Sequence, residues 1–212
     1  YVKPLFSVMW SPILAGFSVL LEHNDDPKII QLCLDGYALC VYLAGKYGLE
    51  EERDTFVMSL YNFTGLRKGF NPRLKEIREK HLLATKALLQ LGTNPNILLK
   101  SSWGTVIECM SRIDYFMNLN ITNKRDSNKE HDSLESQEMV VGNLLRSSID
   151  LNLIDLVFSK SCLFATDEII AFISNLSAIS DLELKGANPR TYCLQKLVEV
   201  AEYNMDRVKF VW

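Results

Sequence analysis

The sequence lacks the short motifs that mark common catalytic and cofactor sites. It contains no C-x-x-C pair, no G-x-S-x-G segment and no complete glycine-rich loop of the kind that cradles phosphate after a strand. Its three histidines, His23, His81 and His131, are scattered and have no second ligand four residues away, which disfavours a metal site. We therefore expect no catalytic residues, no metal and no cofactor in this chain.

An excess of basic residues is also missing. With 23 Lys and Arg against 26 Asp and Glu, the formal net charge is −3, whereas nucleic-acid-binding proteins usually carry a basic excess. The five cysteines, an odd number, lie in apolar patterns, as reduced core residues of a cytosolic protein do. The longest apolar run, from Ile13 to Leu21, is too short to span a bilayer, and no signal peptide is recognisable. These features predict a cytoplasmic protein without nucleic-acid partners.

What the sequence does contain is apolar periodicity of the helical kind. Asp26-Pro27 is a helix start signal, because an Asx side chain accepts from free N–H groups and proline has no N–H to leave unpaired. Two apolar stripes follow at helical spacing: Ile30, Cys33, Tyr37, Val41 and Ala44 form one, and Ile29, Leu32, Gly36, Leu39 and Leu43 form the other. A helix with two stripes is expected to be covered from two directions. Gly48 is the expected stop, and a second helix begins at once at Glu50.

Similar patterns predict helices along the rest of the chain. The segment from Pro4 to Glu22 is expected to be a helix that Pro12 kinks or divides. Further helices are expected to open at Asn71-Pro72, at a cap formed by Ser101 or Ser102, at a Thr166 cap and at Asn188-Pro189, with one more from about Val141 to Phe158. About eight helices in pairs of roughly 40 residues, without a convincing strand pattern, predict an all-α solenoid of the armadillo or HEAT type.

One segment interrupts the helical pattern. Residues 120–138 read NITNKRDSNKEHDSLESQE, without an apolar period, and predict a mobile polar insertion. With that insertion, residues 1–212 are expected to form a single α-solenoid regulatory domain. Because the chain begins with Tyr1 and Trp212 lies inside a helical pattern, we expect it to be a fragment of a longer protein.

Positive charge is concentrated at one place. Six basic side chains fall within one loop and the first turns of the next predicted helix: Arg67, Lys68, Arg73, Lys75, Arg78 and Lys80. Only Glu76 and Glu79 oppose them. We call these six residues the basic patch; it suits anionic lipid or an acidic partner surface, and a plain solvated helix face is the alternative.

Several segments carry a resemblance to a known family. They are WSPILAGFS (Trp10 to Ser18), CLDG (Cys33 to Gly36), GLEEERDTFV (Gly48 to Val57), Phe63-Thr64, Ser102 to Arg112, and the stretch from Asn188-Pro189-Arg190 to Arg207. In the same order, and over nearly the whole chain apart from the insertion, they resemble segments of the brefeldin-A-inhibited group of large Arf guanine-nucleotide exchange factors. The resemblance is to the first homology region downstream of the catalytic domain, and the family's Phe-Arg-Leu-Pro-Gly-Glu exchange motif has no counterpart here.

The resemblance implies a non-catalytic regulatory module in vesicle-mediated protein transport. Such a module would bind GTP-loaded Arf at the trans-Golgi membrane, recruit the exchange factor there and relieve its autoinhibition. The implied partners are an Arf-family GTPase in its GTP form, the anionic Golgi membrane surface, neighbouring helical domains of the same protein and a second copy of the parent. The implied location is cytoplasmic and peripheral on trans-Golgi membranes. The alternative is a structural spacer, or a dimerisation and docking module, that links neighbouring helical domains.

Overall fold

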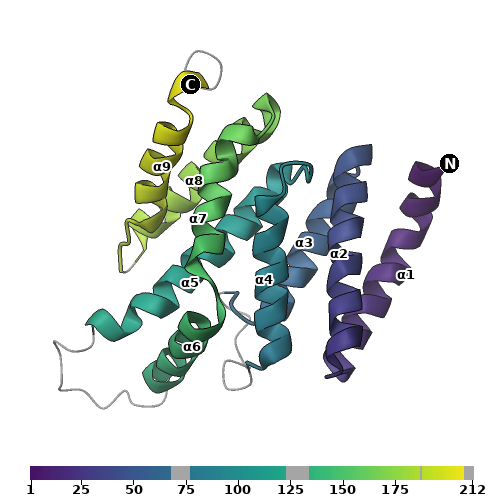
Figure 1. Cartoon of the computed structure of the whole chain (residues 1–212), viewed down its shortest axis with the longest axis horizontal. Coiled ribbons are helices and arrows are strands. Elements are labelled where there is room, and N and C mark those ends of the chain that lie inside the picture. Colours follow the sequence, from purple (N-terminus) through teal and green to yellow (C-terminus); the bar gives the residue numbers. More distant parts are fainter. Residues whose placement is uncertain (68–76, 123–133, 187, 208–212) are drawn as a thin grey trace.

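Helices account for all the regular structure that the computed structural model describes, which covers residues 1–67, 77–122, 134–186 and 188–207. The α-helices are α1 (Val2–His23), α2 (Pro27–Tyr47), α3 (Glu50–Thr64), α4 (Glu79–Thr93), α5 (Trp103–Thr122), α6 (Leu134–Ser148), α7 (Leu151–Ser159), α8 (Thr166–Lys185) and α9 (Tyr192–Tyr203). They lie side by side in a row, with α1 at one end and α9 at the other (Figure 1). The predicted all-α solenoid is confirmed, and about eight helices is close to the nine of the described part.

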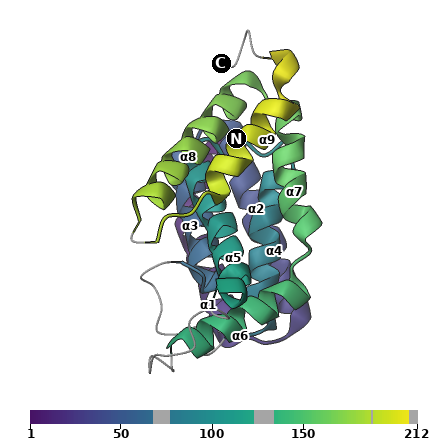
Figure 2. The ribbon, with the colours of Figure 1, turned by 90° about the vertical axis from the view of Figure 1, so that its left-hand side faces the viewer.

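The row has two layers. Helices α2, α4 and α7 pack on one another in one layer, and α3, α5 and α8 do so in the other, as the end-on view in Figure 2 shows. One continuous apolar core runs between the layers, from Phe6 of α1 to Val200 of α9. Each helix therefore contacts its near neighbours in the row, which is the arrangement of a stacked repeat array.

The start and stop signals of α2 are confirmed. The Asp26 carboxylate accepts from the Lys28 N–H at 2.9 Å, and Pro27 is the first helical residue. Gly48 has φ 64°, a left-handed conformation that glycine adopts without steric cost, and its N–H bonds to the carbonyls of Ala44 and Gly45. A single residue, Leu49, separates it from α3.

The two stripes of α2 differ in how well they are covered. The stripe Ile30, Cys33, Tyr37, Val41 and Ala44 is buried in the core. In the other stripe, Gly36 lies against the ring of Phe17 from α1, but Leu32 and Leu39 are 71% and 57% exposed. Cover from the second direction is thus confirmed at Gly36 and incomplete on either side of it.

Several predicted boundaries are wrong. Pro12 lies inside α1, as predicted, but does not divide it, because the helix runs unbroken from Val2 to His23. The helix expected from Val141 to Phe158 is two helices, α6 and α7. The chain turns at Asp150, whose carboxylate accepts from the Asn152 N–H at 2.9 Å and caps α7.

The other predicted start signals do not begin helices where they were expected to. Residues 71 and 72 lie outside the described residues, and α4 begins only at Glu79. Thr166 does not cap α8: it is the first residue of that helix, and no side-chain hydrogen bond caps the helix start. Helix α9 begins at Tyr192 rather than at Asn188-Pro189. Ser101 and Ser102 belong to a 3₁₀ turn, and their hydroxyls donate to Asp54 of α3 instead of capping α5. Both serine hydroxyls are therefore engaged in tertiary hydrogen bonds with α3.

The predicted insertion at 120–138 is shorter at both ends. Helix α5 continues to Thr122 and α6 already begins at Leu134, while residues 123–133 lie outside the described residues.

By length and composition alone, α1 and α2 would each be able to cross a membrane, in contrast to the expectation drawn from the run Ile13 to Leu21. Much of α2 is covered by the surrounding helices, as in the core of an ordinary helical fold, whereas little of α1 is.

Candidate partner-binding groove

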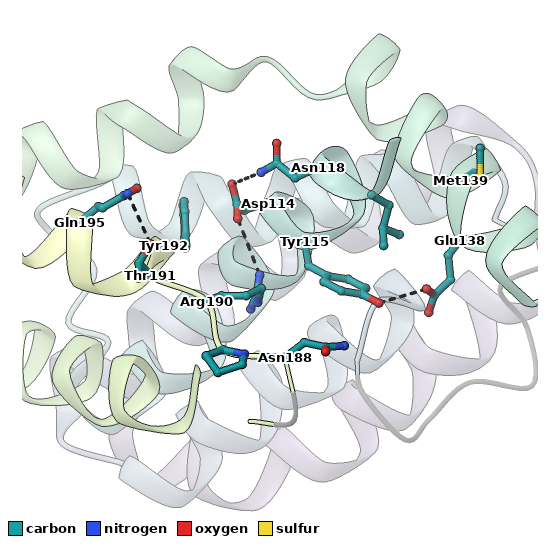
Figure 3. Close-up of a pocket in the computed structure, with 12 residues that line it drawn as sticks. Asp114, Tyr115, Asn118, Glu138, Met139, Asn188, Arg190, Thr191, Tyr192 and Gln195 are labelled. Carbon is teal, nitrogen blue, oxygen red and sulfur yellow. Dashed lines mark hydrogen bonds and ion pairs between the residues drawn. The ribbon is translucent and has the colours of Figure 1, made fainter. Parts of the chain in front are cut away.

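A groove of about 700 Å³ opens between α5, α6 and the segment that leads into α9 (Figure 3). It is lined by Asp114, Tyr115, Asn118 and Leu119 of α5, by Glu138 and Met139 of α6, and by Asn188, Pro189, Arg190, Thr191, Tyr192 and Gln195. Its size is in the range of ligand and peptide sites. We call it the α5–α6–α9 groove.

The wall formed by α5 follows from helical spacing. Asp114 and Asn118 are one turn apart on one face, and the Asn118 amide donates to the Asp114 carboxylate at 2.8 Å. The Tyr115 hydroxyl reaches across to α6 and donates to the Glu138 carboxylate at 3.2 Å (Figure 3). The two helices thereby hold polar groups at the floor and rim of the groove.

Arg190 fixes the third wall. Its guanidinium donates to the Glu183 carboxylate of α8 at 2.8 Å and to the Ser111 carbonyl of α5 at 2.9 Å, and it lies 3.7 Å from the Asp114 carboxylate. It also lies 5.4 Å from the centre of the Tyr115 ring, within the range of a cation–π contact. Glu183 is buried, and its second oxygen accepts from the Cys193 N–H at 2.8 Å. This charge pair therefore joins α5, α8 and α9.

Burial sets the protonation of the groove's titratable groups. It raises the pKa of the Tyr192 hydroxyl well above its ordinary value, with the negative charge of Asp114 acting in the same direction. It also raises the pKa of Tyr115, together with the nearby Glu138 carboxylate, and the pKa of Asp114 despite the opposing charge of Arg190. The two tyrosines are neutral at physiological pH. Within the described residues, the buried Tyr192 hydroxyl has no hydrogen-bond partner.

The described residues contain no cluster of potential metal ligands, since no group of three His, Cys, Asp or Glu side chains among them is placed to hold a metal ion. Four of the five cysteines are buried. Burial raises the pKa of Cys40 to about 11, which keeps that thiol protonated and unreactive. The groove offers amides, hydroxyls, two carboxylates and aromatic faces, which suit the binding of a polypeptide.

The basic patch is described in part, since Lys68, Arg73 and Lys75 lie outside the described residues. Arg67 donates to the Asn62 amide oxygen at 2.9 Å, and Arg78 is exposed and 3.4 Å from the Asp25 carboxylate. Lys80 is only 6% exposed. The patch as a surface for an anionic partner stays a prediction.

Lys80 acts within the fold. Its ammonium group donates to the carbonyls of Glu22 and Asn24, at 2.9 and 3.1 Å, and lies 3.1 Å from the Asp25 carboxylate. The hydrogen bond from Lys80 to the Asp25 carboxylate is the main reason that the pKa of Asp25 is lowered. Lys80 thus ties the start of α4 to the end of α1.

The sequence did not predict this groove. Asn188-Pro189-Arg190 was singled out by resemblance, although as a helix start. Asp114, Tyr115, Glu138 and Tyr192 carried no signal, because they come from three elements that only the fold brings together.

Together, the helices form a stacked α-helical array with a groove between α5, α6 and the segment that leads into α9. No family model matches the chain. It is 27% identical to brefeldin A-inhibited guanine nucleotide-exchange protein 2 of Arabidopsis thaliana, over 98% of this chain and 14% of that protein. For exchange protein 1 of the same plant, the identity is 28% over 98% of this chain and 15% of the relative.

The human relative, brefeldin A-inhibited guanine nucleotide-exchange protein 1 of Homo sapiens, is 26% identical over 100% of this chain and 13% of its own length. The chain is thus a relative of the large brefeldin A-inhibited exchange proteins, as the sequence motifs predicted. It spans 13–15% of the length of these curated relatives.

Proposed function

We propose that this chain is a non-catalytic regulatory module of a large Arf guanine-nucleotide exchange factor. It corresponds to the first homology region downstream of the catalytic domain, within a single domain spanning residues 1–212. It binds GTP-loaded Arf at the trans-Golgi membrane, and this binding recruits the exchange factor and relieves its autoinhibition.

The observation that carries the proposal is the α5–α6–α9 groove. Its third wall includes Arg190 of the Asn188-Pro189-Arg190 segment, which is one of the segments that resemble the exchange factors. The relatives are named for guanine-nucleotide exchange, so a small GTPase is the partner that their names indicate. No part of the proposal requires a cofactor or a metal.

The physical basis for sensing GTP is a difference in the partner. The switch segments of a GTPase are ordered by contacts to the γ-phosphate and are released after hydrolysis. A preformed groove binds an ordered segment at a lower entropic cost than a disordered one. The side-chain amides of Asn118 and Gln195 line the groove, and each can offer its remaining polar atoms to the backbone of such a segment.

A pull-down with Arf loaded with GTP analogue or with GDP tests the proposal. Wild-type chain should retain the GTP form preferentially. Gln195→Lys places a cation at the groove and should weaken that retention at least about tenfold, or ~1.4 kcal/mol. The matched control is Gln31→Lys, which makes the same exposed change on α2, where the new lysine faces Asp35 one turn away.

The outcomes are distinct. Equal retention of the two nucleotide forms by the wild type would contradict the sensing of GTP. A GTP preference that survives in Gln195→Lys would place the Arf-binding surface outside the groove. A nucleotide-release assay on Arf should show no acceleration by the chain, and measurable exchange would contradict its non-catalytic role.

A further inference from the structure

Helix α1 is largely apolar and almost uncharged. From Pro4 to Leu21 it carries no charged side chain. Its polar groups are mostly serines, and the hydroxyls of Ser7 and Ser18 donate to carbonyls one turn back in the same helix, both at 2.9 Å. A helix of this composition is typical of a position covered from all directions.

The structure covers only one side of α1. On the inner side, Phe6 is buried and stacks on Phe56 of α3 at a ring distance of 6.2 Å, and Phe17 lies against Gly36 of α2. The outer side exposes Val2, Leu5, Val8, Met9, Val19 and Leu20. We call these six residues the α1 outer face; Figure 1 shows α1 at the end of the row, with no described helix beyond it.

A socket adjoins this face. A groove of about 430 Å³ lies between α1 and α2, and its lining side chains are apolar apart from the Cys40 thiol. Pro12, Gly16 and Leu20 of α1 line it, and so does the exposed Leu39 of α2. Such a socket accepts a large apolar side chain of a facing helix.

Gly16 has no role inside the described fold. A Cβ added there would meet nothing within 4 Å, and α1 gains no turn from it because the helix continues for another seven residues to His23. A glycine in the middle of an exposed helix costs roughly 1 kcal/mol relative to alanine. The absent side chain makes sense where another backbone approaches closely from outside.

Charge disfavours lipid as the cover. Apolar surfaces that face anionic membranes are usually bordered by Lys and Arg. Lys3 borders one end of α1, whereas Glu22 and Asp25 border the other. The end helix of a solenoid needs a polar outer face to be soluble, and α1 has none.

From these observations, we infer that the α1 outer face and the adjoining socket dock an apolar helix from another segment of the same polypeptide, so that the helical array continues past α1. Relatives of which this chain covers 13–15% have ample length to supply such a helix. The inference does not depend on Arf binding.

Thiol labelling in the natural protein that carries this chain tests the inference. Ala15→Cys and Val8→Cys each place a thiol on the exposed side of α1, and both are small enough changes to leave stacking intact. Cys162, the exposed native cysteine, is the internal reference. Ser147→Cys, on the exposed side of α6, is the matched control. Without lipid, maleimide should modify positions 8 and 15 at least about tenfold more slowly than Cys162, and position 147 at a similar rate to Cys162.

Each other result would overturn the inference. Labelling of positions 8 and 15 at the rate of Cys162 means that the face is open. Protection that disappears on dilution means that a second copy covers it, and protection that requires vesicles of phosphatidylcholine and phosphatidylserine means that lipid does.

Discussion

Glu168 is a buried carboxylate that shapes the loop between α4 and α5. One of its oxygens accepts from the Leu99 N–H at 2.7 Å, the Lys100 N–H at 3.1 Å and the Trp103 indole N–H at 2.7 Å. Lys100 has φ 46°, which is uncommon for a residue other than glycine. The carboxylate compensates for this backbone conformation by satisfying three donors at once.

Replacing Glu168 should therefore be costly. Glu168→Ala leaves the buried Trp103 and Leu99 N–H groups without their acceptor, and we expect the free energy of unfolding to fall by about 2–4 kcal/mol. Urea denaturation followed by circular dichroism measures the change. Asp181→Ala on the exposed side of α8 should change stability by no more than about 0.5 kcal/mol. A similar loss in both variants would contradict this account of Glu168.

The reactivity of the thiols follows from burial. Of the five cysteines, only Cys162 is exposed, and burial raises the pKa of Cys40 to about 11. Ellman's reagent should therefore titrate one thiol rapidly in the native chain at pH 8 and all five in urea, because the thiolate is the reactive form. A Cys162→Ser variant should lose the rapid phase. A second rapid thiol in the native wild type would show that a buried cysteine is accessible.

Asp114 should make stability depend on pH. Burial raises its pKa in the folded chain above the ordinary 3.8, so ionisation costs more in the folded state than in the unfolded state. Its contribution is most favourable below pH 3.8 and declines as the pH rises through the folded pKa. The unfolding free energy of wild type minus that of Asp114→Asn should therefore be lower at pH 7 than at pH 4. A difference that grows with pH would contradict the raised pKa.

At the scale of elements, Gly16 of α1 and Gly36 of α2 both line the apolar socket and should respond to substitution in opposite ways. Gly36→Ala forces a Cβ into the Phe17 ring and should destabilise the chain by about 1–3 kcal/mol. Gly16→Ala meets open space, so the better helix former should stabilise the isolated chain by roughly 0.5–1 kcal/mol. Thermal unfolding should thus shift the two melting temperatures in opposite directions, by about 2–4 °C per kcal/mol for a chain of this size. Shifts of the same sign would contradict the packing described for the pair.

Local chemistry explains which elements could be predicted. Asp26-Pro27 and Gly48 act on their own backbone, so the bounds of α2 follow from the sequence. The serines before α5 have the same chemistry but bond to Asp54, which lies far away in sequence. Pro12 is tolerated because Val8 and Pro12 are both exposed, so water can solvate the carbonyl that the missing N–H leaves free.

The groove is less predictable than the helices. Apolar periodicity shows which face of α5 is inward, but not that Asp114 and Tyr115 lie at the edge of that face beside Arg190. Arg190 donates to the Ser111 carbonyl, although α6, α7 and α8 lie between the two residues in the sequence. The relative placement of helices fixes such contacts, and a single sequence contains no local signal for it.

At the scale of the whole molecule, the basic patch makes a prediction about membranes. If it faces anionic lipid, each basic side chain near the surface contributes about 1 kcal/mol, and the attraction is screened within roughly 8 Å at physiological salt. Arg78→Glu should reduce flotation with phosphatidylserine vesicles several-fold at low salt and less at moderate salt. Arg146→Glu on α6 makes the same charge change at another exposed position and should float like the wild type. Equal flotation by all three proteins would remove the patch from any membrane role.

The layered stacking of neighbouring helices also has a mechanical consequence. Most of the contact between neighbouring helices is apolar and can shift slightly without breaking hydrogen bonds inside a helix, so small rotations at successive interfaces add along the row. The row of helices should therefore be flexible as a whole, so that a small rotation where α9 meets α8 produces a larger displacement of α1. A segment attached at the α1 end should therefore be displaced when the groove near α9 is occupied, although no residue near that segment touches the guest.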